Sequence, residues 1–435
     1  MSIVKNYQKT SFISIIPLLV FVFTFLGFGI YLNDFYALPS PLAALAGIVV
    51  AFLIFKGNME EKTKTFLKGC GERNILTMCI IYLLAGAFAT VSKAAGSVDT
   101  IVNMGMTYIS PQYFAAGIFV IASFLSFASG TSVGAIVALA PIVVELADKS
   151  GAHLGIVGAA LLCGSMFGDN LSIISDTTIA ATQSVSADIK DKFKANFKLA
   201  LPAAILATLA FVYSGMSQEM ATATSAVGDF HWWLVLPYLL VIALAVLGIN
   251  VFVTLFIGLI TAGIIGLSLG SFDFMTFAKK TYEGFTGMSE IFYLSLLTGG
   301  LAAMVEQAGG IRYILNSISK MISGKTSAMF GIGSLVSAAN LCVANNTIAI
   351  IISGKIAKEV THQYQLKPKN AASVLDIFAC YIQGLIPYGA QILILISLSQ
   401  FRIDYKDLFF HSYYLHLLMV FTIGFIVFNI KRLKD

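Results

Sequence analysis

The sequence predicts an all-α polytopic membrane protein of ten spans plus two re-entrant hairpins, arranged as inverted repeats with discontinuous helices. Three observations support this prediction. Only 11% of the 435 residues are charged and 58% are hydrophobic, whereas soluble globular chains carry about 25% charged residues. Apolar segments long enough to cross a bilayer recur from one end of the chain to the other. Polar residues interrupt four of these segments near their middles.

The composition also excludes several classes of protein. The five cysteines lie mostly in apolar stretches without paired spacing, so we expect small buried side chains and neither a disulfide framework nor a zinc site. Gly324-Lys325-Thr326 resembles part of a phosphate-binding loop, but Ser319 occupies the position of its first glycine and no strand precedes it. We therefore predict a protein that is not an enzyme and has no nucleotide site and no bound cofactor.

Ten apolar segments are predicted to cross the bilayer. The first follows Lys5 and Lys9, and no Ala-x-Ala cleavage site comes after it, so we predict an uncleaved span and not a signal peptide. The predicted spans are 11–31, 41–55, 75–92, 154–186, 199–215, 232–247, 250–269, 291–308, 373–400 and 412–430.

Two further apolar segments are predicted to be re-entrant hairpins. Segments 112–147 and 327–354 are about 36 and 28 residues long, and each is polar in its middle. Two spanning helices and a turn need roughly 40 residues. Each segment is therefore expected to enter the membrane and return to its own side.

The distribution of basic residues orients this topology. With the N-terminus inside, the inner segments hold 21 lysines and arginines and the outer segments hold six, as the positive-inside rule requires. The inner group includes Lys190, Lys192, Lys194 and Lys198, which we assign to a cytoplasmic loop. The net charge of +5 therefore reflects topology, and we expect the lipid bilayer and no nucleic acid as a partner. We predict the cytoplasmic membrane as the location, with both termini cytoplasmic.

A weak internal repeat appears at an offset of 214 residues. It places the first hairpin break, 130–132, on 344–346 and brings 169–175 close to 383–389. The charge count makes the two hairpins enter from opposite sides, which is the inverted-repeat architecture of many secondary transporters. The predicted division is an N-terminal span at 1–40, a first repeat at 41–215 with broken helix 154–186, a connecting span at 216–254, and a second repeat at 255–430 with broken helix 373–400.

The polar breaks supply the candidate functional residues. Unwound backbone at membrane depth is tolerated only inside protein or beside a wet cavity, and a carboxylate there usually marks an ion or substrate path. Asp169, Ser172 and Asp176 would share one face if the segment is helical, and they can still converge if it is unwound. Hard oxygen ligands of this kind suit a small alkali cation. The alternative is that Asp169 caps a helix and Asp176 forms hydrogen bonds between helices.

The two hairpin ends are predicted to contact a solute from opposite sides, with packing between the hairpin helices as the alternative. These residues are Thr131, Ser132, Asn345, Asn346 and Thr347. Glu145 and Asp376 lie toward the ends of apolar segments, and we expect both to reach water.

Three motifs resemble the signature of the NhaC-like Na+/H+ antiporter family, within the wider ion transporter superfamily. They are Gly130-Thr131-Ser132, the run Gly168 to Ser172, and Ser175-Asp176-Thr177-Thr178. The resemblance covers nearly the whole chain and implies a scaffold domain, a moving transport domain with two hairpins, and alternating access driven by Na+ or H+. It implies that the cation or proton is bound by Asp169, Ser172, Asp176, Thr177 and Thr178, with Na+ at Asp176 and Thr177.

The same resemblance points to the solute. Asn170 stands where the antiporter branch commonly has histidine, and the segment from Gln383 to Gln391 is more similar to a branch thought to carry amino acids. Asn170, Tyr388 and Gln391 therefore join the predicted solute-binding residues. We expect a secondary transporter that couples Na+ and/or H+ to movement of an amino acid. The alternative is a plain Na+/H+ antiporter, and a homodimer stays open.

Overall fold

Every regular element in the described part of the chain, residues 11–32, 34, 37–217 and 231–431 of this computed structural model, is a helix. Within these described residues, eight helices are long and apolar enough to cross a membrane, or nine when the bent pair Phe274–Gly287 and Ser289–Gln307 counts as one span. The chain is an all-helical, multi-pass membrane protein. The count of ten spans plus two hairpins stays a prediction, because the expected spans 41–55 and 232–247 form apolar helices of only 10–17 residues.

The helices follow one another with short connections. In order, helices α1 to α10 are Ile16–Tyr31, Ser40–Ile54, Met59–Cys70, Arg73–Ala95, Ser97–Tyr108, Phe114–Ser129, Ser132–Ser150, Leu154–Leu171, Asp176–Val185 and Ile189–Met216. Helices α11 to α21 are Leu236–Val246, Val251–Ser268, Phe274–Gly287, Ser289–Gln307, Gly310–Ser319, Lys325–Val343, Asn346–Gln363, Pro368–Leu385, Ala390–Leu398, Tyr405–Phe410 and Tyr413–Lys431. Short 3-10 turns Phe12–Ile15, Pro111–Tyr113 and Trp232–Val235 precede α1, α6 and α11.

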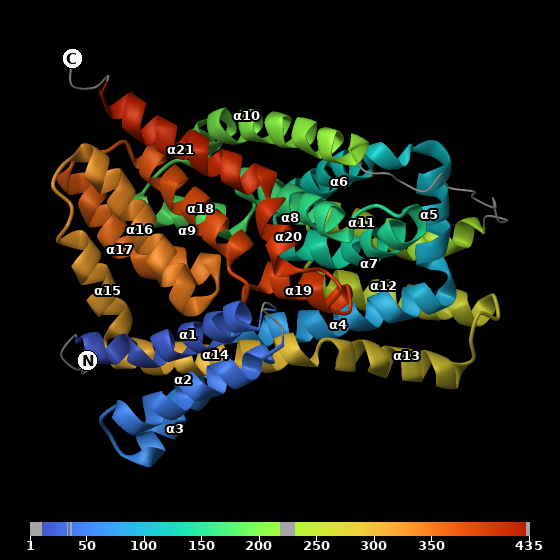
Figure 1. Cartoon of the computed structure of the whole chain (residues 1–435), viewed down its shortest axis with the longest axis horizontal. Helices are drawn as coiled ribbons and strands as arrows, with labels where there is room; N and C mark the ends of the chain where they lie inside the picture. The colour runs from blue at the N-terminus through green and yellow to red at the C-terminus, as the bar shows by residue number, and fades with distance from the viewer. Residues whose placement is uncertain (1–10, 33, 35–36, 218–230, 432–435) are drawn as a thin grey trace.

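Most of the long helices run in one direction and form layers (Figure 1). Helices α10 and α21 lie along one edge of the molecule, and α1, α2, α13 and α14 lie along the opposite edge. Helices α8 and α18 and the short helices α9 and α19 that follow them lie between these edges. The beginning of α1 and the end of α21 lie at the same end of the molecule.

The helix boundaries recur at the offset of 214 residues. Helices α8 and α18 end at Leu171 and Leu385, and the helices that follow them begin at Asp176 and Ala390. Helices α8 and α18 also contact each other at equivalent positions of the repeat. Cys380 Sγ in α18 lies 3.7 Å from the carbonyl oxygen of Met166 in α8, 214 residues earlier. Each broken helix therefore stops in the interior and resumes after four unwound residues.

The two hairpins are longer than the sequence analysis predicts. Helices α6 and α7 with the preceding turn cover 111–150, and α16 and α17 cover 325–363, in place of 112–147 and 327–354. The last turns of α17 carry Lys355, Lys358 and Glu359, which are exposed, so hydropathy alone ended that helix too early. Gly130 and Ala344, the first residues after α6 and α16, have positive φ angles of 71° and 49°.

Glycines bring α8 into close contact with α6. A β-carbon on Gly164 would lie 2.3 Å from the carbonyl oxygen of Phe119, and one on Gly168 would lie 2.3 Å from that of Ser123. Small residues spaced four apart let two membrane helices approach at their backbones. This contact positions the last turn of α8, in which Asp169 directly follows Gly168.

Candidate functional site

Buried polar side chains from both halves of the chain meet where the broken helices face the hairpin ends. We call the first group the Asp169 cluster. Its members are each at most 6% exposed and are Asp169, Ser132, Ser175, Thr177, Gln383 and Gln391.

Two hydroxyl groups hold the carboxylate of Asp169. Ser132 Oγ donates to Asp169 Oδ2 at 2.8 Å, and Ser175 Oγ donates to Asp169 Oδ1 at 2.5 Å. Ser175 Oγ also lies 3.0 Å from Thr177 Oγ1. Ser132 is the first residue of α7 and Ser175 is the N-cap of α9. Two helix N-termini, which carry partial positive charge, therefore lie beside this carboxylate.

The cluster continues into the second half of the chain. Gln391 Nε2 donates to Ser132 Oγ at 3.1 Å, and Gln383 Nε2 donates to Gln391 Oε1 at 2.8 Å. Gln383 Nε2 also lies 3.3 Å from the carbonyl oxygen of Ala344, at the end of the second hairpin. One path of hydrogen bonds thus joins both helix breaks and both hairpin ends.

The charge of Asp169 has no fixed counter-ion. The carboxylate forms no ion pair with any lysine, arginine or histidine among the described residues. Burying an ionised carboxylate without a partner is costly, and the hydroxyl donors and helix N-termini offset only part of that cost. The cluster can therefore take up an exchangeable cation or a proton.

A second group of buried polar residues lies next to the first, and we call it the Lys192 cluster. Its members are Lys192, Asp376, Asn170, Asn196 and Thr178. Lys192 Nζ lies 2.5 Å from Asp376 Oδ2 and donates to Thr178 Oγ1 at 2.7 Å and to the carbonyl oxygen of Asn170 at 3.0 Å. Asn170 Nδ2 and Asn196 Nδ2 each donate to the same Asp376 Oδ2 at 3.0 Å.

This cluster corrects two predictions. Asp376 was expected to reach water and Lys192 to lie in a cytoplasmic loop, but their side chains are 0% and 1% exposed. Lys190, Lys194 and Lys198 are exposed as expected. The signal in the sequence is the helical spacing from Lys192 to Asn196 and on to buried Leu199, Ala200 and Ala203, which places the lysine on the apolar face of α10.

The structure separates the two aspartates of the first broken helix. Helix α8 ends at Leu171, Ser172 is extended with φ −62° and ψ 131°, and α9 begins at Asp176. Asp176 is exposed, and its carboxylate joins neither cluster among the described residues. Ser172 is buried, but its hydroxyl accepts only a local bond from Ile174 N at 3.4 Å. Thr177 and Thr178 are divided between the two clusters.

The remaining candidate residues of the hairpin ends begin helices. Thr131 Oγ1 accepts from Gly134 N at 3.3 Å, and Asn345 Oδ1 accepts from Ile348 N at 3.0 Å. These side chains cap α7 and α17, and they are half-buried together with Asn346 and Thr347. Tyr388 is buried, and its hydroxyl donates to the carbonyl oxygen of Leu341 in α16 at 2.9 Å.

Charged residues away from the clusters form ion pairs between helices. Lys93 Nζ lies 2.9 Å from Glu145 Oε2, and Lys149 pairs with Asp99 and lies 3.7 Å from Glu145. Glu145 is 9% exposed, so it is held by two lysines and does not stand open to water as expected.

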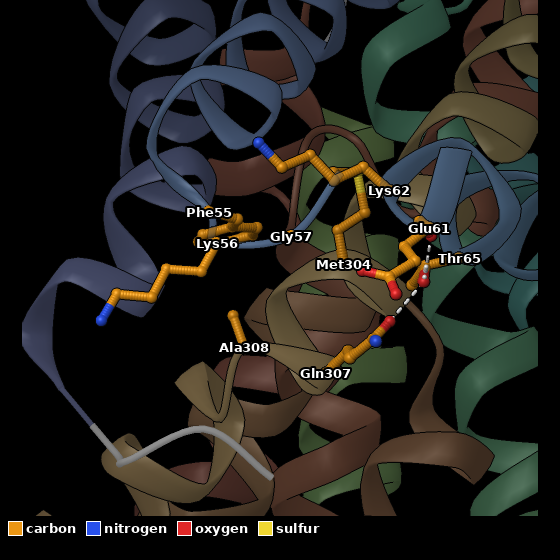
Figure 2. A pocket seen from close by; sticks show the side chains of 9 residues that line it. All are labelled: Phe55, Lys56, Gly57, Glu61, Lys62, Thr65, Met304, Gln307 and Ala308. Carbon is orange, nitrogen blue, oxygen red and sulfur yellow. Dashed lines mark hydrogen bonds between the residues drawn. The ribbon is translucent and has the colours of Figure 1, made fainter. Parts of the chain in front are cut away.

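A separate cavity of about 120 Å³ lies between the α2–α3 connection and the end of α14, where Thr65 is hydrogen-bonded to Gln307 (Figure 2). Neither cluster contributes to its lining. The cavity is therefore separate from both clusters.

Comparison with known proteins gives matches over most of the chain. The chain is 24% identical over 410 residues to the malate-2H+/Na+-lactate antiporter of Bacillus subtilis, covering 87% of each chain. It is 23% identical to the Na+/H+ antiporter NhaC of Alkalihalophilus pseudofirmus, over 72% of this chain and 73% of that protein. It is 20% identical to the arginine/ornithine antiporter ArcD of Halobacterium salinarum, over 84% and 82%.

The sequence profile described as the Na+/H+ antiporter family matches residues 4–216 and 217–430, almost the whole chain. That family consists of transporters and not of enzymes, and its coupling ions are Na+ and H+. The matched segments contain both clusters and both hairpins. The chain belongs to the Na+/H+ antiporter family.

Proposed function

We propose that this Na+-coupled secondary transporter exchanges Na+ or H+ at the Asp169 cluster for an amino acid that binds between the two hairpin ends. One observation carries the proposal. Asp169 is a buried carboxylate with two hydroxyl donors and no ionic partner among the described residues. A site of this kind must gain a cation or a proton when it closes, because the uncompensated charge is costly in a low-dielectric interior.

The amino-acid assignment follows from the mixed polarity of the helix ends. An amino acid carries a carboxylate and an ammonium group. The N-termini of α7 and α17 at the hairpin ends can accept the carboxylate, while Asp169 and carbonyl oxygens such as that of Ala344 can accept the ammonium. Gln391 is hydrogen-bonded to Ser132. Through this bond, movement of the hairpin end on solute binding would be coupled to the cation site.

Two relatives support a solute in addition to the ions. ArcD of Halobacterium salinarum is named for exchange of arginine and ornithine, and the Bacillus subtilis relative is named for exchange of malate and lactate. Both names describe small carboxylate-bearing solutes moved by proteins that match this chain over more than four fifths of its length. By analogy, we propose the amino-acid class for this chain.

Transport in proteoliposomes tests the proposal. Vesicles with an imposed Na+ gradient are measured for internal pH and for uptake of radiolabelled amino acids from a panel of all charge types. We expect uptake of at least one amino acid that depends on the gradient and disappears in Asp169→Asn. A Na+-driven pH change without uptake of any amino acid would reject the solute and leave the ion exchange.

Plain Na+/H+ exchange is the second candidate, and the tight packing of the site favours it. Asp169, Ser132 and Gln391 are 6%, 2% and 3% exposed, and Ser132 is hydrogen-bonded to each of the other two. A proton or a Na+ ion needs only small movements there, whereas an amino acid needs the hairpin ends to separate. The relative NhaC of Alkalihalophilus pseudofirmus is named for this exchange.

The orientation in the membrane is part of the proposal. We place the protein in the cell membrane with the beginning of α1 and the end of α21 on the cytoplasmic side, since both lie at one end of the molecule (Figure 1) and the positive-inside rule favours that side. Labelling of cysteines introduced at Lys194 and at Lys406 from outside intact cells tests this. Labelling at Lys194 and not at Lys406 would reverse the orientation.

A further inference from the structure

Lys192 is the least expected residue of the interior. It lies in the first turn of α10 with its side chain 1% exposed, while lysines on either side of it in the sequence are exposed. Lysine is almost never fully buried unless it is paired. Its position therefore requires a specific reason.

The ammonium group of Lys192 is surrounded by oxygen atoms from three helices, α8, α9 and α18. It contacts a carboxylate oxygen of Asp376, the hydroxyl oxygen of Thr178 and the carbonyl oxygen of Asn170 at 2.5, 2.7 and 3.0 Å. These three contacts use all three of its donors. Carboxylate, hydroxyl and carbonyl oxygens are also the ligands that hard metal cations prefer in proteins.

The cluster holds more oxygen atoms than the ammonium group can use. Asp376 Oδ1 and Asn196 Oδ1 are buried, and neither has a hydrogen-bond partner among the described residues. Buried polar atoms are nearly always satisfied, and each exception calls for an explanation such as an unseen ion. A spherical cation could bind these additional oxygens, because its coordination is not limited to three fixed N–H directions.

We propose that the Lys192 cluster is a second cation site, which the Lys192 ammonium occupies in this conformation and from which Na+ displaces it. The exchange leaves the charge of the site unchanged, so Asp376 is never left without a cation. Lys192 has a long flexible side chain in the first helical turn, next to exposed Asp188 and Asp191, which can receive it at the surface. The inference deepens the proposed function and rests on it, since it adds a second Na+ site beside the Asp169 cluster.

Na+ binding to the purified protein tests the proposal. The apparent Na+ affinity is taken from thermal unfolding in increasing NaCl, with choline chloride keeping the ionic strength constant. Lys192→Met leaves Asp376 without its tethered cation. We expect this variant to be less stable than the wild type in choline and to bind Na+ at least about tenfold more tightly. Equal Na+ affinity in the two proteins would overturn the proposal, because Lys192 would then be a structural partner only.

A double variant separates a cation site from a general loss of stability. Lys192→Met with Asp376→Asn removes both charges, and replacing both members of a buried ion pair is often tolerated. This double variant must lose the added Na+ affinity. If it keeps that affinity, the proposal is wrong. Should Lys192→Met fail to fold in both salts, the comparison of Asp169→Asn with Asp169→Asn/Asp376→Asn decides. We expect the second replacement to remove the Na+-dependent stabilisation that the first leaves, and an unchanged stabilisation would overturn the inference.

Failure of the proposed function gives a different result. If Asp169→Asn changes neither Na+ affinity nor transport, the Asp169 cluster is not the cation site, and Lys192→Met still decides whether the Lys192 cluster binds Na+.

Discussion

Gly168→Ala perturbs the contact that places Asp169. A β-carbon at this position would lie 2.3 Å from the carbonyl oxygen of Ser123 and 2.5 Å from the backbone nitrogen of Phe127. Ordinary contacts begin at 3.4 Å, so α6 must move away from α8 by roughly 1 Å in a closely packed interior. Overpacking of this kind costs about 1–3 kcal/mol.

The displacement should also reach the Asp169 cluster, the proposed cation site. Helix α6 continues through Gly130 into α7, so a shift of α6 draws Ser132 away from Asp169, where the present distance between their oxygens is 2.8 Å. We therefore expect Gly168→Ala to lose Na+-driven transport as well as stability.

Gly117 offers a matched control on α6. A β-carbon there has no atom within 4 Å, so Gly117→Ala should gain up to about 1 kcal/mol from helix propensity. The free energy of unfolding of both variants is measured by titrating SDS into detergent micelles, and transport is measured in proteoliposomes. If Gly168→Ala were as stable and as active as Gly117→Ala, the inferred α6–α8 contact would be refuted.

Three further predictions concern single contacts. Ser132→Ala removes a hydrogen bond to a charged oxygen and should weaken apparent Na+ affinity roughly tenfold. Ser172→Ala is the control, because the Ser172 hydroxyl makes only the local bond to Ile174 N, and it should change the Na+ affinity little. Equal losses of affinity in the two variants would contradict the assignment. Tyr388→Phe removes the bond to Leu341 and should lower the free energy of unfolding by about 0.5–1.5 kcal/mol; a variant of unchanged stability would show that this bond contributes nothing. Asp148→Asn breaks a partly exposed ion pair with Arg402. It should lower the free energy of unfolding by no more than about 1 kcal/mol, and by less at high salt. A loss above about 2 kcal/mol in a salt series would argue against the exposed geometry.

Hydropathy and spacing predict much of the fold. Long apolar segments and their polar middles give the helices and the positions of the breaks, because both signals are local. The ends of the hairpins are missed, since exposed Lys355, Lys358 and Glu359 continue α17 beyond its apolar part. Short helices such as α5 and α15 are also missed, because they lack the length and uniform apolarity of a span.

The site is only partly predictable for a geometric reason. Asp169 and Asp176 share a face only if the helix between them is continuous. The extended backbone at Ser172 ends that helix and turns Asp176 away from the cluster. Ser175 reaches Asp169 from only six residues away, but through the unwound backbone between them. Asp376 and Gln383 take part through contacts between distant segments, such as Asn196 to Asp376 across 180 residues, which no local pattern encodes. The spacing of Lys192 and Asn196 indicates that they face the interior, but it does not indicate their partner Asp376.

Transport by Asp169→Asn beside Asp176→Asn tests the central claim most directly. Both replacements remove one negative charge from the first broken helix, but Asp169 is buried in the cluster and Asp176 is exposed. The Na+-driven change of internal pH in proteoliposomes is measured for each, at equal protein density. We predict that Asp169→Asn loses at least about 90% of the rate, a loss of about 1.4 kcal/mol or more, and that Asp176→Asn loses at most a few-fold. Loss of transport in Asp176→Asn with full activity in Asp169→Asn would contradict the account.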